Sequence, residues 1–187
     1  MGSLEDGCGS KPLYSSHAAS ECCAEGGASG LLRAASSIPS RRLRDLEVHC
    51  PIQKAAWLHK TFEYGTWGGE IRSEFKPQAG EIVALEHWGS SGFANTDLDL
   101  QLKKHGMHQL IVMGLIAHTC LEATVRYAAE LGYEVTVVKD ATADYSDVEM
   151  RAALDINIPN YASAIVTTNQ IVDSISSLSS AGISVGR

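Results

Sequence analysis

Cys120 is the residue of this sequence whose type and setting most plainly suggest covalent chemistry. It follows an apolar stretch, LIVMGLIA, and opens an amphipathic one, TCLEATVRYAAELG, so we predict that it lies where a strand meets a helix N-terminus. Unpaired N–H groups and the positive end of the helix dipole favour an anion there, in this case the nucleophilic thiolate. Two interpretations stay open on pattern alone: a catalytic nucleophile, or a buried core cysteine, which is a common position for this residue type.

Two histidines, His87 and His118, follow predicted strands and are candidates for a general base that takes the thiol proton. Each is also explained as a hydrogen-bonded supporting residue or a surface residue. Trp88 and Phe93 are candidates for the wall of an apolar pocket, although core packing accounts for both as well. A metal held by Glu86, His87 and His118 is disfavoured, because these residues lie on loops without a fixed ligand spacing. We therefore predict no metal.

The elements that must position these residues form an α/β pattern. Apolar strands are predicted at 81–88, 109–115 and 133–140, and helices at 97–106 and 119–132 separate them. Such strands are typical of a parallel sheet covered on both faces, with right-handed crossovers. Ligands bind outside the carboxyl ends of the strands in these folds. One crevice is therefore expected to collect the residues that follow the three strands: Glu86-His87-Trp88, His118-Thr119-Cys120 and Asp140-Ala141-Thr142.

The composition of the chain predicts a tail at each end of one folded domain. Residues 1–44 are rich in Gly, Ser and Ala and are predicted to be a disordered or divergent tail, with a short helix at 30–35 as one option. The folded domain is expected to span 45–178. It would begin with a helix at 51–63 and end with a helix at 147–158, an edge strand and a terminal helix, before a frayed C-terminus at 179–187.

Charge and composition exclude several classes of function. A net charge of −7 and a pI near 5.4 argue against nucleic acid or an anionic membrane as a partner. No run of about eighteen apolar residues is present, and the N-terminus lacks the pattern of a secretory signal. An odd number of cysteines argues for free thiols in a reducing compartment. We expect a cytoplasmic protein that handles a small molecule.

Two segments, EHWGSSGFANTDLDLQLKKHG and GLIAHTCLEATVRYAAELGYEVTVVKDATAD, closely resemble the isochorismatase-like cysteine hydrolases. The likeness runs from about Pro51 to Ile175. It implies a three-layer Rossmann-like fold, usually a homo-oligomer, that needs no cofactor and hydrolyses amides or related bonds of small molecules through a cysteine. Members of this family include nicotinamidases, ureidoacrylate and carbamoylsarcosine amidohydrolases, and isochorismatase itself, which cleaves a vinyl ether without a thiol.

The resemblance also implies roles for particular residues. Cys120 matches the family nucleophile, and the Leu115–Ile116 bond matches the position of a non-proline cis peptide. The backbone N–H groups of Ile116 and Cys120 would then form the oxyanion hole. Glu86, His87, Trp88, Phe93 and His118 are the residues expected to line the substrate pocket.

The chain departs from the family pattern in two catalytic residues. The family Asp, at the end of an apolar first strand, has no counterpart, because the sequence before Pro51 offers only DLEVHC. The family Lys is also absent, and Glu86 or His87 stands in its place. We therefore expect a truncated or alternatively spliced form, or a degenerate relative, and favour truncation.

Such a sheet would lack its first strand, which lies in the middle of the sheet in this family, so that its loss would leave a gap between the neighbouring strands. The expected function is hydrolysis of an amide-type C–N bond through Cys120, impaired by loss of the Asp and Lys. The alternative is a catalytically inactive relative that acts as a binding or oligomer-partner protein. An isochorismatase-type reaction without the thiol is less favoured, because Cys120 is present.

Overall fold

The computed structural model describes residues 20–23, 31–34, 50–61, 63, 65–84 and 89–180. Its strands are β1 Ser20–Cys23, β2 Leu31–Ala34, β3 Val83–Ala84, β4 Gln109–Leu115, β5 Glu134–Ala143 and β6 Ala164–Val166. Its α-helices are α1 Pro51–Leu58, α2 Leu98–Lys104, α3 Glu122–Glu130, α4 Asp147–Arg151 and α5 Thr168–Ser180. Shorter helical turns are η1 Trp67–Gly69, η2 Ser73–Phe75, η3 Ala117–Leu121, η4 Ala152–Asn157 and η5 Ile158–Asn160, of which η3 and η4 are π-helical. None of the helices in this part of the chain has both the length and the apolar character needed to cross a bilayer.

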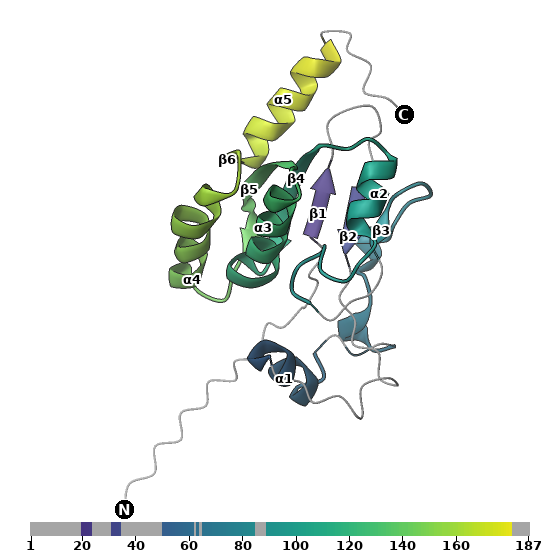
Figure 1. Ribbon diagram of the computed structural model, residues 1–187, viewed down its shortest axis with the longest axis vertical. Helices are drawn as coiled ribbons and strands as arrows, with labels where there is room; N and C mark the ends of the chain where they lie inside the picture. Colours follow the sequence, from purple (N-terminus) through teal and green to yellow (C-terminus); the bar gives the residue numbers. More distant parts are fainter. Residues whose placement is uncertain are drawn as a thin grey trace, which may run out of the picture.

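The strands form one sheet in the order β3-β2-β1-β4-β5-β6 (Figure 1). β4, β5 and β6 are parallel neighbours, and β2 is parallel to β3. β1 is antiparallel to both β2 and β4, so it runs against the other strands. Helices connect the parallel strands, with α3 between β4 and β5 and α4 between β5 and β6. The three-layer α/β fold predicted from the sequence is therefore confirmed.

Two of these strands come from residues 1–44, the predicted tail. The expectation of disorder does not hold for Ser20–Cys23 and Leu31–Ala34, and the optional helix at 30–35 is replaced by a strand. β1 occupies the middle of the sheet, where loss of the first strand was expected to leave a gap. The physical reason is that β2 and β4 each present a row of N–H and C=O groups, which an extended segment can pair in either direction.

The hydrophobic core is centred on β4, β5 and the helical segment between them. Fully buried strand residues are expected where helices cover both faces of a sheet, and fully buried helix residues recur at turn spacing. The residues of these elements without any exposed surface include Val112, Leu121, Val125, Ala128, Val135 and Val137. The helix stops where the sequence predicts, because Gly132 adopts a φ of +92°, a conformation that favours glycine.

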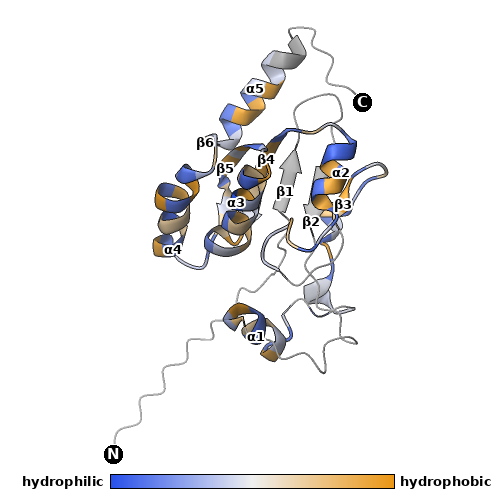
Figure 2. Cartoon of the chain, in the orientation of Figure 1, coloured by the Kyte–Doolittle hydropathy of each residue, from blue (hydrophilic) through white to orange (hydrophobic). Residues whose placement is uncertain are grey.

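α1 differs from its prediction in both length and packing. It begins at Pro51 as expected but ends at Leu58, and none of its residues is buried. Ile52, Trp57 and Leu58 are all exposed. Figure 1 shows α1 beyond the edge of the sheet, and Figure 2 shows hydrophobic and polar residues mixed around it. This helix therefore contributes nothing to the core described above.

A partly buried hydrogen bond joins the residue before β5 to α2. Tyr133, which is 7% exposed, donates its hydroxyl to Asp99 Oδ1 at 2.9 Å. Lys103 donates to the other oxygen of Asp99 at 2.8 Å. The Lys103 hydrogen bond lowers the pKa of Asp99 below its ordinary value, and the Tyr133 hydroxyl lowers it further. Burial, followed by the contact with Asp99, raises the pKa of Tyr133.

Removing the Tyr133 hydroxyl should destabilise the fold. Tyr133→Phe is expected to lower the free energy of unfolding by about 1–2 kcal/mol, because a hydrogen bond to a carboxylate is lost and Asp99 loses a partner. Urea denaturation at neutral pH measures the change. Tyr127→Phe is the matched control, since Tyr127 is exposed on α3 and its substitution should change stability by less than about 0.5 kcal/mol.

The same pair predicts a pH dependence with a definite sign. Because the pKa of Asp99 is lower in the folded state than the unfolded value of about 3.9, its ionised form stabilises the fold above about pH 4. That contribution is lost as the pH falls through the folded-state value. Urea denaturation between about pH 4 and about pH 2 should therefore show a smaller acid-induced loss of stability in Asp99→Asn than in the unsubstituted chain. Identical pH profiles would show that the pair contributes no proton linkage.

Candidate functional site

Cys120 lies in the π-helical turn η3, directly between β4 and α3. The residues that flank Cys120 both donate their N–H groups to the carbonyl of Ile116, Thr119 at 3.2 Å and Leu121 at 3.1 Å. Such turns are rare and often occur at functional sites. The peptide bond between Leu115 and Ile116 is cis. The structure therefore places the thiol at the strand-to-helix junction that was predicted from the sequence.

The side chain of Cys120 is half-buried. Its Sγ accepts a long hydrogen bond from the Thr119 hydroxyl at 3.7 Å. Among the described residues, no carboxylate or imidazole is hydrogen-bonded to this sulfur. A base that would take the thiol proton directly is therefore not provided by this part of the chain.

Thr124 links Cys120 to the loop that follows β3. Its hydroxyl donates to the Cys120 carbonyl at 2.7 Å and accepts the N–H of Gly92 at 3.0 Å. Thr124 is 1% exposed, so its hydroxyl makes both hydrogen bonds from a buried side chain. One buried hydroxyl therefore joins the Cys120 turn to the loop Ser91-Gly92-Phe93.

The predicted pocket residues divide into three groups. Phe93 is 6% exposed and belongs to the hydrophobic core, with its ring centroid 5.7 Å from that of Tyr133. This is the core-packing alternative that the sequence left open. Glu86, His87 and Trp88 lie outside the described residues, so their pocket role stays a prediction. His118 lies in the same turn as Cys120.

His118 is held by Asp144, which follows β5. The carboxylate of Asp144 accepts the His118 backbone N–H at 2.9 Å and ring Nδ1 at 2.7 Å. It also accepts the N–H of Tyr145 at 2.7 Å. The Asp144 side chain has no exposed surface, whereas that of His118 is 29% exposed. A buried carboxylate thus connects the Cys120 turn to the next loop along the sheet edge.

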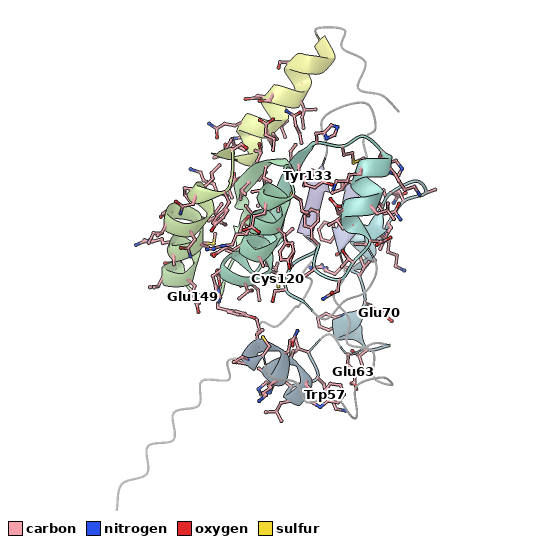
Figure 3. The ribbon with its side chains drawn as sticks, in the orientation of Figure 1. Trp57, Glu63, Glu70, Cys120, Tyr133 and Glu149 are labelled. Carbon is pink, nitrogen blue, oxygen red and sulfur yellow. The ribbon has the colours of Figure 1, made fainter. Side chains whose placement is uncertain are left out.

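The other ring nitrogen of His118 faces α4. Its Nε2 lies 4.0 Å from Oε1 of Glu149, whose second oxygen accepts the Ser146 hydroxyl at 2.7 Å. Figure 3 shows Cys120 and Glu149 toward the end of the molecule nearer α1, with Tyr133 toward the opposite end. His118, Asp144 and Glu149 offer ligand atoms within 4.8 Å of one another. The Asp144 oxygens, however, already accept three N–H groups.

The third predicted group at the sheet edge is displaced along the chain. β5 continues to Ala143, and a register shift in the β4–β5 ladder pairs Gly114 with Thr142. Asp140 therefore lies within the strand, where its carboxylate accepts the N–H and hydroxyl of Thr168 at the start of α5. The Thr168 N–H lowers the pKa of Asp140. Asp140 supports α5, and the residue that reaches the Cys120 turn is Asp144.

A second buried carboxylate, that of Glu122, lies at the start of α3, directly after the turn. Glu122, 9% exposed, accepts Arg126 Nη2 at 2.6 Å and the Asn157 amide at 3.1 Å. Arg126 also donates to the hydroxyl of Tyr161 at 3.1 Å and lies over its ring. These contacts attach the first residue of α3 to η4 and the segment after η5.

Sequence reasoning did not single out Thr124, Asp144 or Glu149. Glu149 carried a readable signal, because Ser146 and Glu149 have the spacing of a helix capping box and Ser146 caps α4. Asp144 would have been found by extending the third strand to Ala143. Thr124 carried no such signal, since a threonine inside a helix has many uses and its partner Gly92 is distant in sequence.

Comparisons with known proteins identify the family. A family model for the isochorismatase domain matches residues 33–170. An uncharacterized isochorismatase family protein of Bacillus subtilis, YddQ, is 43% identical over 82 residues, covering 44% of this chain and 45% of that protein. The ureidoacrylate amidohydrolase RutB of Variovorax paradoxus is 32% identical over 110 residues, covering 59% and 43%. The matches thus span less than half the length of each of these two relatives.

A solved structure of an isochorismatase-like hydrolase from Alkaliphilus metalliredigens agrees in fold. Its TM-score is 0.61 at 24% identity, and the likeness covers 78% of this chain and 72% of that one. The family model covers well over half of the chain and starts within the predicted tail, at residue 33. The chain therefore belongs to the isochorismatase-like cysteine hydrolase family.

Proposed function

We propose that this chain hydrolyses an amide-type C–N bond of a small molecule, with Cys120 as the nucleophile. The observation that carries the proposal is the position of Cys120 in a π-helical turn at the carboxyl end of β4. Ligands of open α/β sheets bind at this edge. RutB is named as an amidohydrolase, which supports C–N hydrolysis as the reaction class.

The chemistry follows from the thiol and the turn around it. The Cys120 thiolate attacks the substrate carbonyl carbon, and the C–N electron pair leaves on nitrogen together with the proton that the thiol gave up. The resulting thioester is then cleaved by water, which releases the acid and restores the thiol. The N–H groups of Ile116 and Cys120 are the proposed donors to the oxyanion in both steps, each worth about 3–4 kcal/mol in comparable sites.

The rate is expected to be low, because the chain lacks the Asp and Lys of the family pattern. The direction of β1 supports this view. β1 is antiparallel to β4, so its carboxyl end lies at the edge opposite to Cys120. Loss of one member of a cooperative triad typically costs about four to six powers of ten in rate.

The same observation favours a second candidate function. Within the described residues, no carboxylate or imidazole is hydrogen-bonded to the Cys120 sulfur, and a chain that keeps the fold and the thiol in this way can serve as a binding protein or as the partner of an intact relative. A small-molecule ligand, a homo-oligomeric state and a cytoplasmic location accompany both candidates and stay predictions.

If Cys120 is activated, its thiol should be alkylated faster than that of Cys50, although it is less exposed. At about pH 6, iodoacetamide is expected to alkylate Cys120 at least about tenfold faster than Cys50, because the thiolate is the reacting form and the helix N-terminus beside Cys120 favours an anion. Cys50 is the internal reference, since it is exposed while Cys120 is half-buried. Peptide mapping by mass spectrometry on the full chain measures both rates. Equal rates would remove the case for activation.

Ammonia release from a panel of small primary amides separates the two candidate functions. Hydrolysis by the unsubstituted chain that disappears in Cys120→Ala supports the enzyme. A chain that binds an amide but releases no ammonia, with binding unchanged in Cys120→Ala, supports the binding protein.

The Thr124 hydroxyl should matter to both stability and reactivity. Thr124→Val keeps the shape but leaves the Gly92 N–H and the Cys120 carbonyl without this partner, which should cost about 1–3 kcal/mol and slow Cys120 alkylation. Thr124→Ser retains the hydroxyl and is expected to stay within about 1 kcal/mol of the unsubstituted chain. Urea denaturation and the alkylation assay measure the two effects. Equal behaviour of the Val and Ser variants would contradict a role for the hydroxyl.

A further inference from the structure

We propose that Asp144 is a positioning residue, whose buried carboxylate holds the Cys120 turn through two N–H groups of His118. The inference rests on the proposed function insofar as Cys120 is the nucleophile. Neither the family comparison nor the sequence pattern assigns a role to Asp144. It does not touch the thiol, and it acts through the backbone of the turn.

The first step of the argument is the number and origin of the donors. Asp144 accepts the backbone N–H and the ring Nδ1 of His118, and the N–H of its own neighbour Tyr145. Its side chain has no exposed surface. Hydrogen bonds to an ionised acceptor are shorter and about twice as strong as neutral ones, and distances of 2.7–2.9 Å agree with that. The two His118 bonds therefore form a strong link between the Cys120 turn and the loop after β5.

The second step is the direction of the His118 ring. The contact with Asp144 implies the tautomer of His118 in which Nδ1 carries the proton and donates it to the carboxylate. The other ring nitrogen, Nε2, faces Glu149 on α4. The imidazole thus faces the β5 loop and α4, and it makes no hydrogen bond to Cys120 Sγ. His118 then acts as an anchor of the turn and not as the general base that the sequence suggested.

The third step is the level of Asp144 in the sheet. The register shift between β4 and β5 pairs Leu115 with Ala143. The next residues of the two strands, Ile116 and Asp144, therefore leave the sheet at the same level. An aspartate at this position can reach the backbone of η3, whereas Asp140 binds Thr168 at α5.

Substitutions at both ends of the link give an ordered expectation for Cys120 alkylation at about pH 6. In Asp144→Asn the side-chain NH₂ group faces one of the His118 donors and cannot accept its hydrogen bond. The Cys120 alkylation rate relative to that of Cys50 should then fall at least about tenfold. His118→Ala keeps the backbone N–H and should fall less. His118→Asn restores a side-chain donor near the Nδ1 position and should lie within about twofold of the unsubstituted chain.

Asp140→Asn is the matched control, because Asp140 is on the same strand and also accepts a backbone N–H, but serves α5. Its Cys120 rate should be unchanged within about twofold. Cys50 is already exposed in the folded chain, so global unfolding would raise the ratio of the Cys120 rate to the Cys50 rate, whereas loss of the positioning contact lowers it. A purely structural role would lower stability without the rescue by His118→Asn.

Amide hydrogen exchange of the peptide that contains Ala117–Leu121 gives a readout that does not depend on thiol activation. Exchange should accelerate in Asp144→Asn and His118→Ala, and it should be unchanged in His118→Asn and Asp140→Asn. If Asp144→Asn does not fold, the comparison of His118→Ala with His118→Asn carries the test in both assays.

The possible results separate the two proposals. A fast Cys120 in the unsubstituted chain that stays equally fast in Asp144→Asn overturns the positioning role alone. A slow Cys120 in the unsubstituted chain overturns the proposed nucleophile, and exchange then decides the anchor on its own. Unchanged exchange in Asp144→Asn, or reactivity that needs added Zn²⁺ and is abolished by EDTA, overturns the anchor.

Discussion

Parallel pairing between β4 and β5 sets the position of both loops that build the candidate site. The ladder runs from Gln109 opposite Glu134 to Leu115 opposite Ala143, with a register shift on the way. Without the shift, Leu115 would lie opposite Asp140, and Asp144 would leave the sheet about three residues further along the β4 chain than it does. With it, the Cys120 turn and Asp144 leave the sheet together, and a buried carboxylate can join them. The geometry of the thiol is therefore a property of two strands and their register.

At the centre of the sheet, β1 fills the strand position but runs antiparallel to its two neighbours. β2 and β4 need a neighbour for their backbone groups, and β1 supplies it as an antiparallel strand. A strand in either direction satisfies the backbone hydrogen bonds of its neighbours. An antiparallel β1, however, places no residue of its carboxyl end near Cys120, because that end lies at the opposite edge of the sheet. The fold can thus be completed at this position by a strand whose carboxyl end points away from the Cys120 edge.

Local sequence patterns predicted the elements whose stability is local. The strand at 109–115, the helix stop at Gly132 and the strand-to-helix junction at Cys120 each follow from apolar runs, helical spacing or a glycine. β1 and β2 could not be predicted, since four-residue strands of mixed composition depend on pairing, and besides each other these two pair with β4 and β3, which lie far away in sequence. The displacement from Asp140 to Asp144 has the same cause, because strand register depends on the pairing of whole strands and not on the residues at one end.

Three separate side chains hold the Cys120 turn and the start of α3, and none of them is hydrogen-bonded to the Cys120 sulfur. Thr124 holds the carbonyl of Cys120, Asp144 holds His118, and Glu122 attaches α3 to η4. Each of these groups is buried, so substitution would leave an unsatisfied partner and lower stability. Selection for folding alone would therefore keep the turn in shape. A well-formed nucleophile turn in this family is thus evidence about architecture, and activity depends separately on a base that reaches the sulfur.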